Sequence, residues 1–158
     1  MNLEQQPLGI VRKWISDQVF KKEKQVECPC CQQTIKSYKR KISGATARGL
    51  IIISKSIEGE FHLEDTLKEL DLLAACRSDF PKLKYWGLIT QLQGKRADGS
   101  SRNGHYRITE AGRMFINNKH SIQKYMHVYN GEAFKSSGEY MFIKDCLGEK
   151  FSYEELIS

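Results

Sequence analysis

The chain has 158 residues and a mass of 18.2 kDa, which suits one domain or one small domain with attachments. Hydrophobic residues make up 40%, yet no apolar run approaches the ~20 residues that span a bilayer, so we expect no membrane segment. No basic stretch followed by an apolar run opens the chain, and its five cysteines do not resemble a secreted disulfide framework, so we expect a cytoplasmic protein.

The net charge of +6 is unevenly distributed. Residues 12–48 carry ten Lys/Arg and three Asp/Glu, residues 49–76 carry two and six, and residues 77–113 carry eight and three. Two basic blocks therefore flank an acidic one. This pattern favours a polyanionic partner, because neutralised phosphates release counterions and that release dominates affinity. A mildly basic soluble protein without such a partner gives the same totals.

Residues 1–24 predict an N-terminal amphipathic helix. Its apolar stripe recurs at helical spacing and consists of Leu8, Val11, Ile15 and Val19. Pro7 suits the first turn, where its missing N–H costs nothing. The stripe packs either on the domain core or on a second copy of the chain, so a homodimer through this helix is one alternative.

Residues 25–41 predict a small β-hairpin with cysteines at its tip. Cys28 and Cys31 have the spacing that lets two thiolates bind one tetrahedral zinc ion. The CPxC segment at 28–31 resembles one zinc-ribbon knuckle, although Gln32 stands where such knuckles have glycine and no second CxxC follows. The residues that could supply two further ligands are Cys30, Cys76, Cys146, His120 and His127.

The cysteine segment therefore fits either a zinc site or a metal-free hairpin. A thioredoxin-like redox role is disfavoured, because no βαβ pattern surrounds the motif.

The next segment predicts two helices with a short strand between them. Apolar residues at helical spacing indicate a helix over 42–57, and 61–63 indicates a short strand that pairs later in the chain. Residues 63–75 form an acidic amphipathic pattern. Because its carboxylates repel phosphate, we expect this helix to lie away from a polyanionic partner.

Residues 78–86 predict a short helix with one apolar and one polar face. Ser78 is a good N-cap, and Phe80, Leu83 and Trp86 should pack inward. The opposite face and its flanks carry the candidate ligand-binding side chains Arg77, Ser78, Lys82, Lys84 and Tyr85, with Pro81 among them.

Two strands and a glycine-rich tip follow this helix. Strand 88–93 leads into the segment 94–104, which reads GKRADGSSRNG and contains Lys95, Arg96 and Arg102. Its glycines supply the positive-φ positions of a hairpin tip, and its basic side chains must project into solvent. The return strand is HYRIT, after which Thr109 caps a helix over 110–118.

The order of helix, strand, basic tip, strand and helix resembles the C-terminal half of a winged-helix domain, over about residues 42–118. The resemblance implies that the helix 78–86 is the recognition helix that enters the DNA major groove. It also implies that Lys95, Arg96 and Arg102 lie on the wing, which reaches the backbone or the minor groove.

The tail 119–158 predicts two strands, 125–129 and 140–143, separated by Asn130-Gly131 and by 136–138. Residues 144–147 and 153–157 indicate short helical pieces. We expect the tail to add strands to the cysteine hairpin and to form a small β-rich satellite module.

No catalytic pattern is recognisable, since GxxxxGK[ST], HExxH and GxSxG are all missing from the sequence. We therefore expect no enzyme and no small-molecule substrate. The leading expectation is an α+β protein with a winged-helix core that binds double-stranded DNA, either a transcriptional regulator or a phage-type DNA-associated factor. The alternative is a protein-interaction module that uses the same fold, because fold alone does not separate the two.

Overall fold

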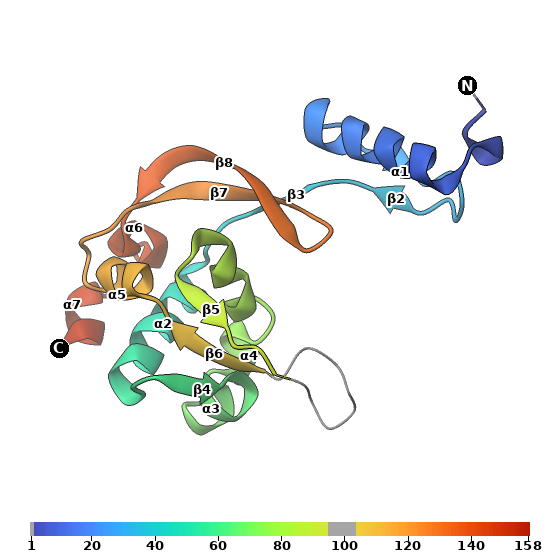
Figure 1. Cartoon of the computed structure of the whole chain (residues 1–158). Coiled ribbons are helices and arrows are strands. Elements are labelled where there is room, and N and C mark those ends of the chain that lie inside the picture. The colour runs from blue at the N-terminus through green and yellow to red at the C-terminus, as the bar shows by residue number, and fades with distance from the viewer. Residues whose placement is uncertain (1, 95–103) are drawn as a thin grey trace. The chain divides into compact units, whose positions relative to one another are not determined.

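The structure is a computed structural model that describes residues 2–94 and 104–158 (Figure 1). It mixes helices and strands, so the α+β class is confirmed. The chain divides into two compact units, which we describe separately. The small unit is Met1–Arg40 with Tyr125–Ser137, and the large unit is Lys41–Lys124 with Gly138–Ser158. Within the described residues, no helix has both the length and the apolar character needed to span a bilayer.

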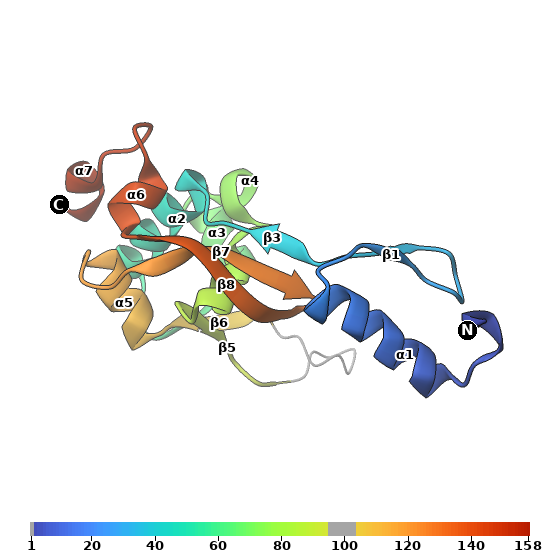
Figure 2. The same ribbon diagram turned by 90° about the horizontal axis from the view of Figure 1, so that it is seen from above.

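The small unit begins with helices and continues with short strands. In order these are the 3₁₀ turn η1 (Leu3–Gln5), α1 (Leu8–Ser16), the π-helical turn η2 (Asp17–Lys21), β1 (Val26–Glu27), β2 (Thr34–Ile35) and β3 (Tyr38–Arg40). The predicted N-terminal helix is therefore confirmed. Its residues Val11, Ile15 and Val19 are buried against Val26 and Ile35 of the cysteine hairpin, beside which α1 runs (Figure 2). Most of the apolar stripe is thus covered within one chain.

The small unit is completed by residues from the long strands β7 (Ile122–Tyr129) and β8 (Glu132–Met141). β7 pairs antiparallel with β3, and the sheet order is β3-β7-β8. We expected the tail to add strands to the segment 25–41, and this is correct in part: β7 pairs with β3 of that segment, and both belong to the small unit. The strands β1 and β2 form a separate two-stranded sheet.

Asn130 and Gly131 make the turn between β7 and β8. Both have positive φ, 51° and 76°, as a two-residue hairpin turn requires. The expected second break at 136–138 does not occur, because β8 continues through it. Gly138 adopts φ +85° within the strand, and such a glycine is typical of a bulge and not of a loop.

The large unit contains a three-stranded sheet surrounded by short helices. In chain order its remaining elements are α2 (Gly44–Ser56), β4 (Glu60–His62), α3 (Leu63–Glu69), α4 (Leu73–Cys76), the 3₁₀ helix η3 (Phe80–Trp86), β5 (Ile89–Gln91), β6 (His105–Ile108), α5 (Glu110–Ile116), α6 (Ile143–Leu147) and α7 (Tyr153–Ile157). The sheet order is β4-β6-β5, and both pairings are antiparallel (Figure 1). The predicted pairing of the short strand near 61–63 with a later strand is confirmed.

The acidic segment forms two helices and not the continuous helix that was expected over 63–75. The chain leaves α3 after Glu69, and Asp71 adopts a left-handed φ of +56°. Aspartate tolerates this conformation better than most residues, because its short side chain bonds locally. The break lets Leu72 become buried and starts α4 in a new direction.

The core of the large unit is centred on α2, which contacts α4, α5, α6, α7 and η3. Its fully buried side chains include Leu50, Ile51, Ile53, Leu67, Leu72, Phe80, Leu83, Leu88, Phe115 and Ile143. Cys76 is buried, and its sulfur would lie 3.0 Å from a Cβ added at Gly49, so the glycine allows α2 and α4 to approach. The C-terminal helices also belong here, because α6 and α7 both contact α2.

Candidate functional site

A cleft of about 370 Å³ in the large unit contains the candidate residues of the helical segment. It is bordered by the start of α3, by η3 and by the beginning of β6. Its lining consists of His62, Leu63, Glu64, Leu67, Arg77, Ser78, Pro81, Lys82, Lys84, Tyr85, Gln91, Gly104 and Tyr106. All five predicted residues from 77 to 85 therefore lie in one cleft. The other three, Lys95, Arg96 and Arg102, lie outside the described residues.

The helix η3 presents these side chains because it is a 3₁₀ helix and not the expected α-helix. With three residues per turn, Phe80, Leu83 and Trp86 fall in one column, and all three are buried. Lys82 and Tyr85 fall in another column and line the cleft. The apolar spacing of three was visible in the sequence, but an α-helix accommodates it as well, so packing decides between the two.

The predicted cap at Ser78 is wrong. The residue before η3 is Asp79, and its side chain makes no capping hydrogen bond. Its carboxylate instead accepts a hydrogen bond from the Lys82 ammonium group at 2.8 Å. The prediction fails because η3 starts one residue later than the sequence pattern indicated, so Asp79 and not Ser78 occupies the N-cap position.

The cleft contains carboxylates as well as cations. Glu64 lies 3.8 Å from the Arg77 guanidinium and 3.4 Å from the Lys68 ammonium group. The acidic helix therefore does not lie apart from the basic side chains, because the first turn of α3 borders the same cleft. Both pairs are exposed, and exposed ion pairs contribute roughly 0–1 kcal/mol, so Glu64 holds these two cations only weakly.

His62 lies at the edge of the cleft and holds the start of α3. Its Nδ1 accepts a hydrogen bond from the Asp65 amide at 3.4 Å and lies 3.0 Å from the Asp65 carboxylate. Its ring meets that of His105 at 5.2 Å between centroids, across the β4–β6 pair. Its position three residues before Asp65 was the available signal for a cap.

The backbone at the base of the predicted wing is tightly constrained. Gly104 has φ +75°, and a Cβ added there would lie 2.8 Å from His62 Nε2. The Leu63 amide donates to the Gly104 carbonyl at 2.9 Å, and the Leu92 amide donates to the His105 carbonyl at the same distance. These bonds fix Leu92 and Gly104, which are described residues on either side of 95–103.

Two backbone hydrogen bonds close the tip of the cysteine hairpin in the small unit. The Cys28 amide donates to the Gln33 carbonyl at 2.8 Å, and the Gln32 amide donates to the Cys28 carbonyl at 2.9 Å. Gln32 adopts φ +63°, the conformation that glycine takes most easily. Hydrogen bonds from the backbone N–H groups of Cys31 and Cys30 lower the pKa of the Cys28 thiol.

The described residues do not supply a complete zinc site around the tip of the cysteine hairpin. Across 2–94 and 104–158, no three His, Cys, Asp or Glu side chains gather in a metal-binding group. Cys76 and Cys146 belong to the large unit, where burial raises their thiol pKa values to about 11 and about 12. His127 is in the small unit, but its Nε2 lies 2.7 Å from the Ser137 hydroxyl. Cys28 and Cys31 thus correspond to half of a tetrahedral site.

Comparisons of the chain with protein-family models, with curated proteins and with solved structures found no match.

Proposed function

We propose that the large unit is a winged-helix module that binds double-stranded DNA, within a transcriptional regulator or a phage-type DNA-associated protein. One observation carries this proposal. The elements follow one another as α2, β4, α3, α4, η3, β5 and β6, with the three strands in one antiparallel sheet, and this is the order expected from the sequence resemblance. In this arrangement the segment 78–86 serves as the recognition helix, and the segment 94–104 serves as the wing.

The cleft beside η3 gives the proposal its chemistry. Lys82, Lys84 and Arg77 provide cations for backbone phosphates, and Tyr85 and Ser78 provide hydroxyl groups. Seven residues of 3₁₀ helix extend about 14 Å, comparable to the ~12 Å width of a major groove. DNA therefore meets the side of a short, rigid helix whose apolar column is fixed in the core.

The ion pairs in the cleft predict how binding depends on salt. Lys82 must leave Asp79, and Arg77 must leave Glu64, before either contacts a phosphate. Each phosphate contact contributes about 0.9 to the slope of log K against log salt. We therefore expect modest affinity for arbitrary duplex DNA with a steep salt dependence.

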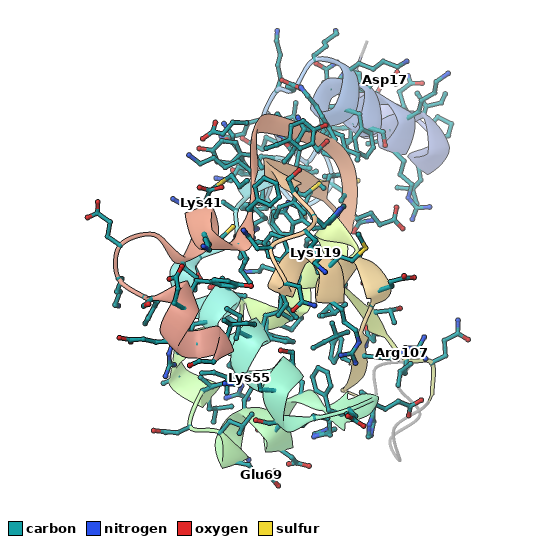
Figure 3. The ribbon with its side chains drawn as sticks, turned by 90° about the vertical axis from the view of Figure 1, so that its left-hand side faces the viewer. Asp17, Lys41, Lys55, Glu69, Arg107 and Lys119 are labelled. Atoms are coloured by element: carbon teal, nitrogen blue, oxygen red, sulfur yellow. The ribbon has the colours of Figure 1, made fainter. Side chains whose placement is uncertain are left out.

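The test compares two double variants with the same change in charge. Lys82→Ala with Lys84→Ala removes two cleft cations. Lys119→Ala with Lys150→Ala removes two exposed lysines of the large unit that do not line the cleft, of which Lys119 is labelled in Figure 3. The cleft variant should lower the salt slope by about 1.8, and the control should leave it unchanged. Equal slopes in the two variants, with circular dichroism confirming the fold, contradict the proposal.

A protein-interaction module is the second candidate, and Glu64 within the cleft favours it. A cleft that carries both signs of charge suits a protein surface better than a row of phosphates. Such a module binds duplex DNA with almost no salt dependence, so the same titration separates the two candidates.

A homodimer through α1 completes the proposal on partners. Leu8 and Ile10 remain 54% and 45% exposed after the rest of the stripe is buried, and these two side chains provide the contact. Sedimentation of Leu8→Glu with Ile10→Glu against the parent chain tests it: an unchanged mass excludes this interface.

A further inference from the structure

An exposed tyrosine in the small unit lies between two basic side chains. Tyr38 on β3 is 47% exposed. The Lys36 ammonium nitrogen lies 5.3 Å from the centroid of its ring, and the central carbon of the Arg40 guanidinium lies 4.9 Å from it. Both distances are within the ~6 Å of a cation–π contact. The cluster of Lys36, Tyr38 and Arg40, here called the β3 cluster, thus combines an aromatic surface with two positive charges.

The register of the sheet explains why the β3 cluster is open. β3 is an edge strand, and Tyr38 and Arg40 project to the same side because side chains alternate along a strand. Their cross-strand partners on β7 are Val128 and Met126. Lys39 projects to the opposite side, where its ammonium group lies 3.9 Å from the centroid of the Tyr125 ring. Each face of β3 therefore carries basic side chains beside an aromatic ring.

The charge around the β3 cluster is one-sided. Residues 28–40 include Lys36, Lys39 and Arg40 and contain no Asp or Glu. Two acidic side chains elsewhere in the small unit are engaged with other lysines: Glu23 pairs with Lys135, and Asp17 pairs with Lys21. An anionic partner therefore meets little repulsion at this edge.

We propose that the β3 cluster binds single-stranded nucleic acid, with a base stacked on Tyr38 and the flanking phosphates paired with Lys36 and Arg40. Stacking requires a base whose face is free, and the bases of a duplex already stack on one another. An acidic peptide satisfies the two cations but offers no flat group to stack on the exposed part of the Tyr38 ring. This inference does not rest on the function proposed for the large unit, because it concerns different residues in a different unit.

Fluorescence anisotropy of the full chain with labelled oligo-dT and oligo-U of about 12 nucleotides tests the proposal. Tyr38→Ala should weaken binding by about 5- to 150-fold, which corresponds to the loss of one stacked base. Tyr38→Trp should retain the affinity, because it preserves a stacking surface. The matched control is Tyr140→Ala, which removes an exposed tyrosine of the large unit and should change nothing.

Three results overturn the proposal: no binding of either oligonucleotide by the parent chain, equal affinities of Tyr38→Ala and Tyr140→Ala, or full affinity in Tyr38→Leu, which lacks an aromatic ring. Competition by poly-glutamate at equal charge concentration with no effect of Tyr38→Ala assigns the surface to an acidic peptide instead. The two proposals also separate cleanly. Tyr38→Ala should leave duplex binding intact, and the Lys82→Ala, Lys84→Ala variant should leave oligo-dT binding intact.

Discussion

The indole N–H of Trp86 donates a hydrogen bond to the backbone carbonyl of Gln123, 37 positions later in the chain, at 2.8 Å. Trp86 is 8% exposed and ends the buried column of η3. One side chain therefore joins the candidate recognition helix to the first half of β7. Trp86 therefore holds η3 in place by its buried ring and by its hydrogen bond to Gln123.

This arrangement predicts graded losses at Trp86. Trp86→Ala should lower the free energy of unfolding by about 3–5 kcal/mol, because it leaves a large cavity. Trp86→Phe keeps most of the apolar volume but removes the indole hydrogen bond to the Gln123 carbonyl, which costs about 0.5–1.5 kcal/mol. Urea denaturation measures both values. Tyr140→Ala serves as the exposed aromatic control and should stay within ~0.5 kcal/mol of the parent; a loss below ~1 kcal/mol in Trp86→Ala contradicts the assigned packing.

Gly112 predicts a second effect on stability. A Cβ at this position would lie 2.1 Å from the Leu88 carbonyl oxygen, because α5 begins directly against the chain that enters β5. Gly112→Ala must therefore shift the backbone. We expect the free energy of unfolding to fall by about 1–3 kcal/mol, the usual cost of overpacking.

Gly9 in α1 provides the matched control for Gly112, since no atom lies within 4 Å of its added Cβ. Gly9→Ala should leave stability unchanged or raise it by up to about 1 kcal/mol, because alanine has the higher helix propensity. If thermal denaturation gives the same change for both variants, the close approach of α5 to Leu88 is wrong.

The five cysteines should differ in reactivity. The thiolate is the nucleophile, and backbone N–H groups of Cys31 and Cys30 lower the pKa of Cys28, whereas burial raises that of Cys146 to about 12. Brief treatment of the folded chain with iodoacetamide at neutral pH should modify Cys28 and its neighbours and leave Cys76 and Cys146 intact. Peptide mass spectrometry locates the labels. In urea all five should react, and equal labelling of Cys28 and Cys146 in the folded chain contradicts this prediction.

The half-buried Cys146 thiol also predicts a loss of stability at high pH. Burial raises its pKa from the ordinary 9.0 to about 12, so the unfolded chain loses this proton at a lower pH than the folded chain does. The contribution is fully present below pH 9 and is lost as the pH rises towards 12. Cys146→Ala should therefore flatten the fall in unfolding free energy over this window. If the unfolding free energies of the variant and the parent chain fall in parallel as the pH rises, this prediction is contradicted.

Local signals in the sequence were sufficient to locate most helices and strands. Thr109 caps α5 by accepting a hydrogen bond from the Gly112 amide at 3.0 Å, three residues away, and Ser43 caps α2 by the same spacing. Asn130-Gly131 makes the two-residue turn between the long strands. Each signal involves residues within about four positions of one another, so their order along the chain already specifies the interaction.

The tertiary structure alone decided which segments meet. The spacing of Phe80, Leu83 and Trp86 suits both an α-helix and a 3₁₀ helix, and the core contacts select the latter. No neighbouring residue predicts that β3 pairs with β7 or that Glu64 faces Arg77 in the cleft. These contacts depend on the path of the backbone between distant segments. Burial of apolar surface across the whole unit determines that path, and a short stretch of sequence does not encode it.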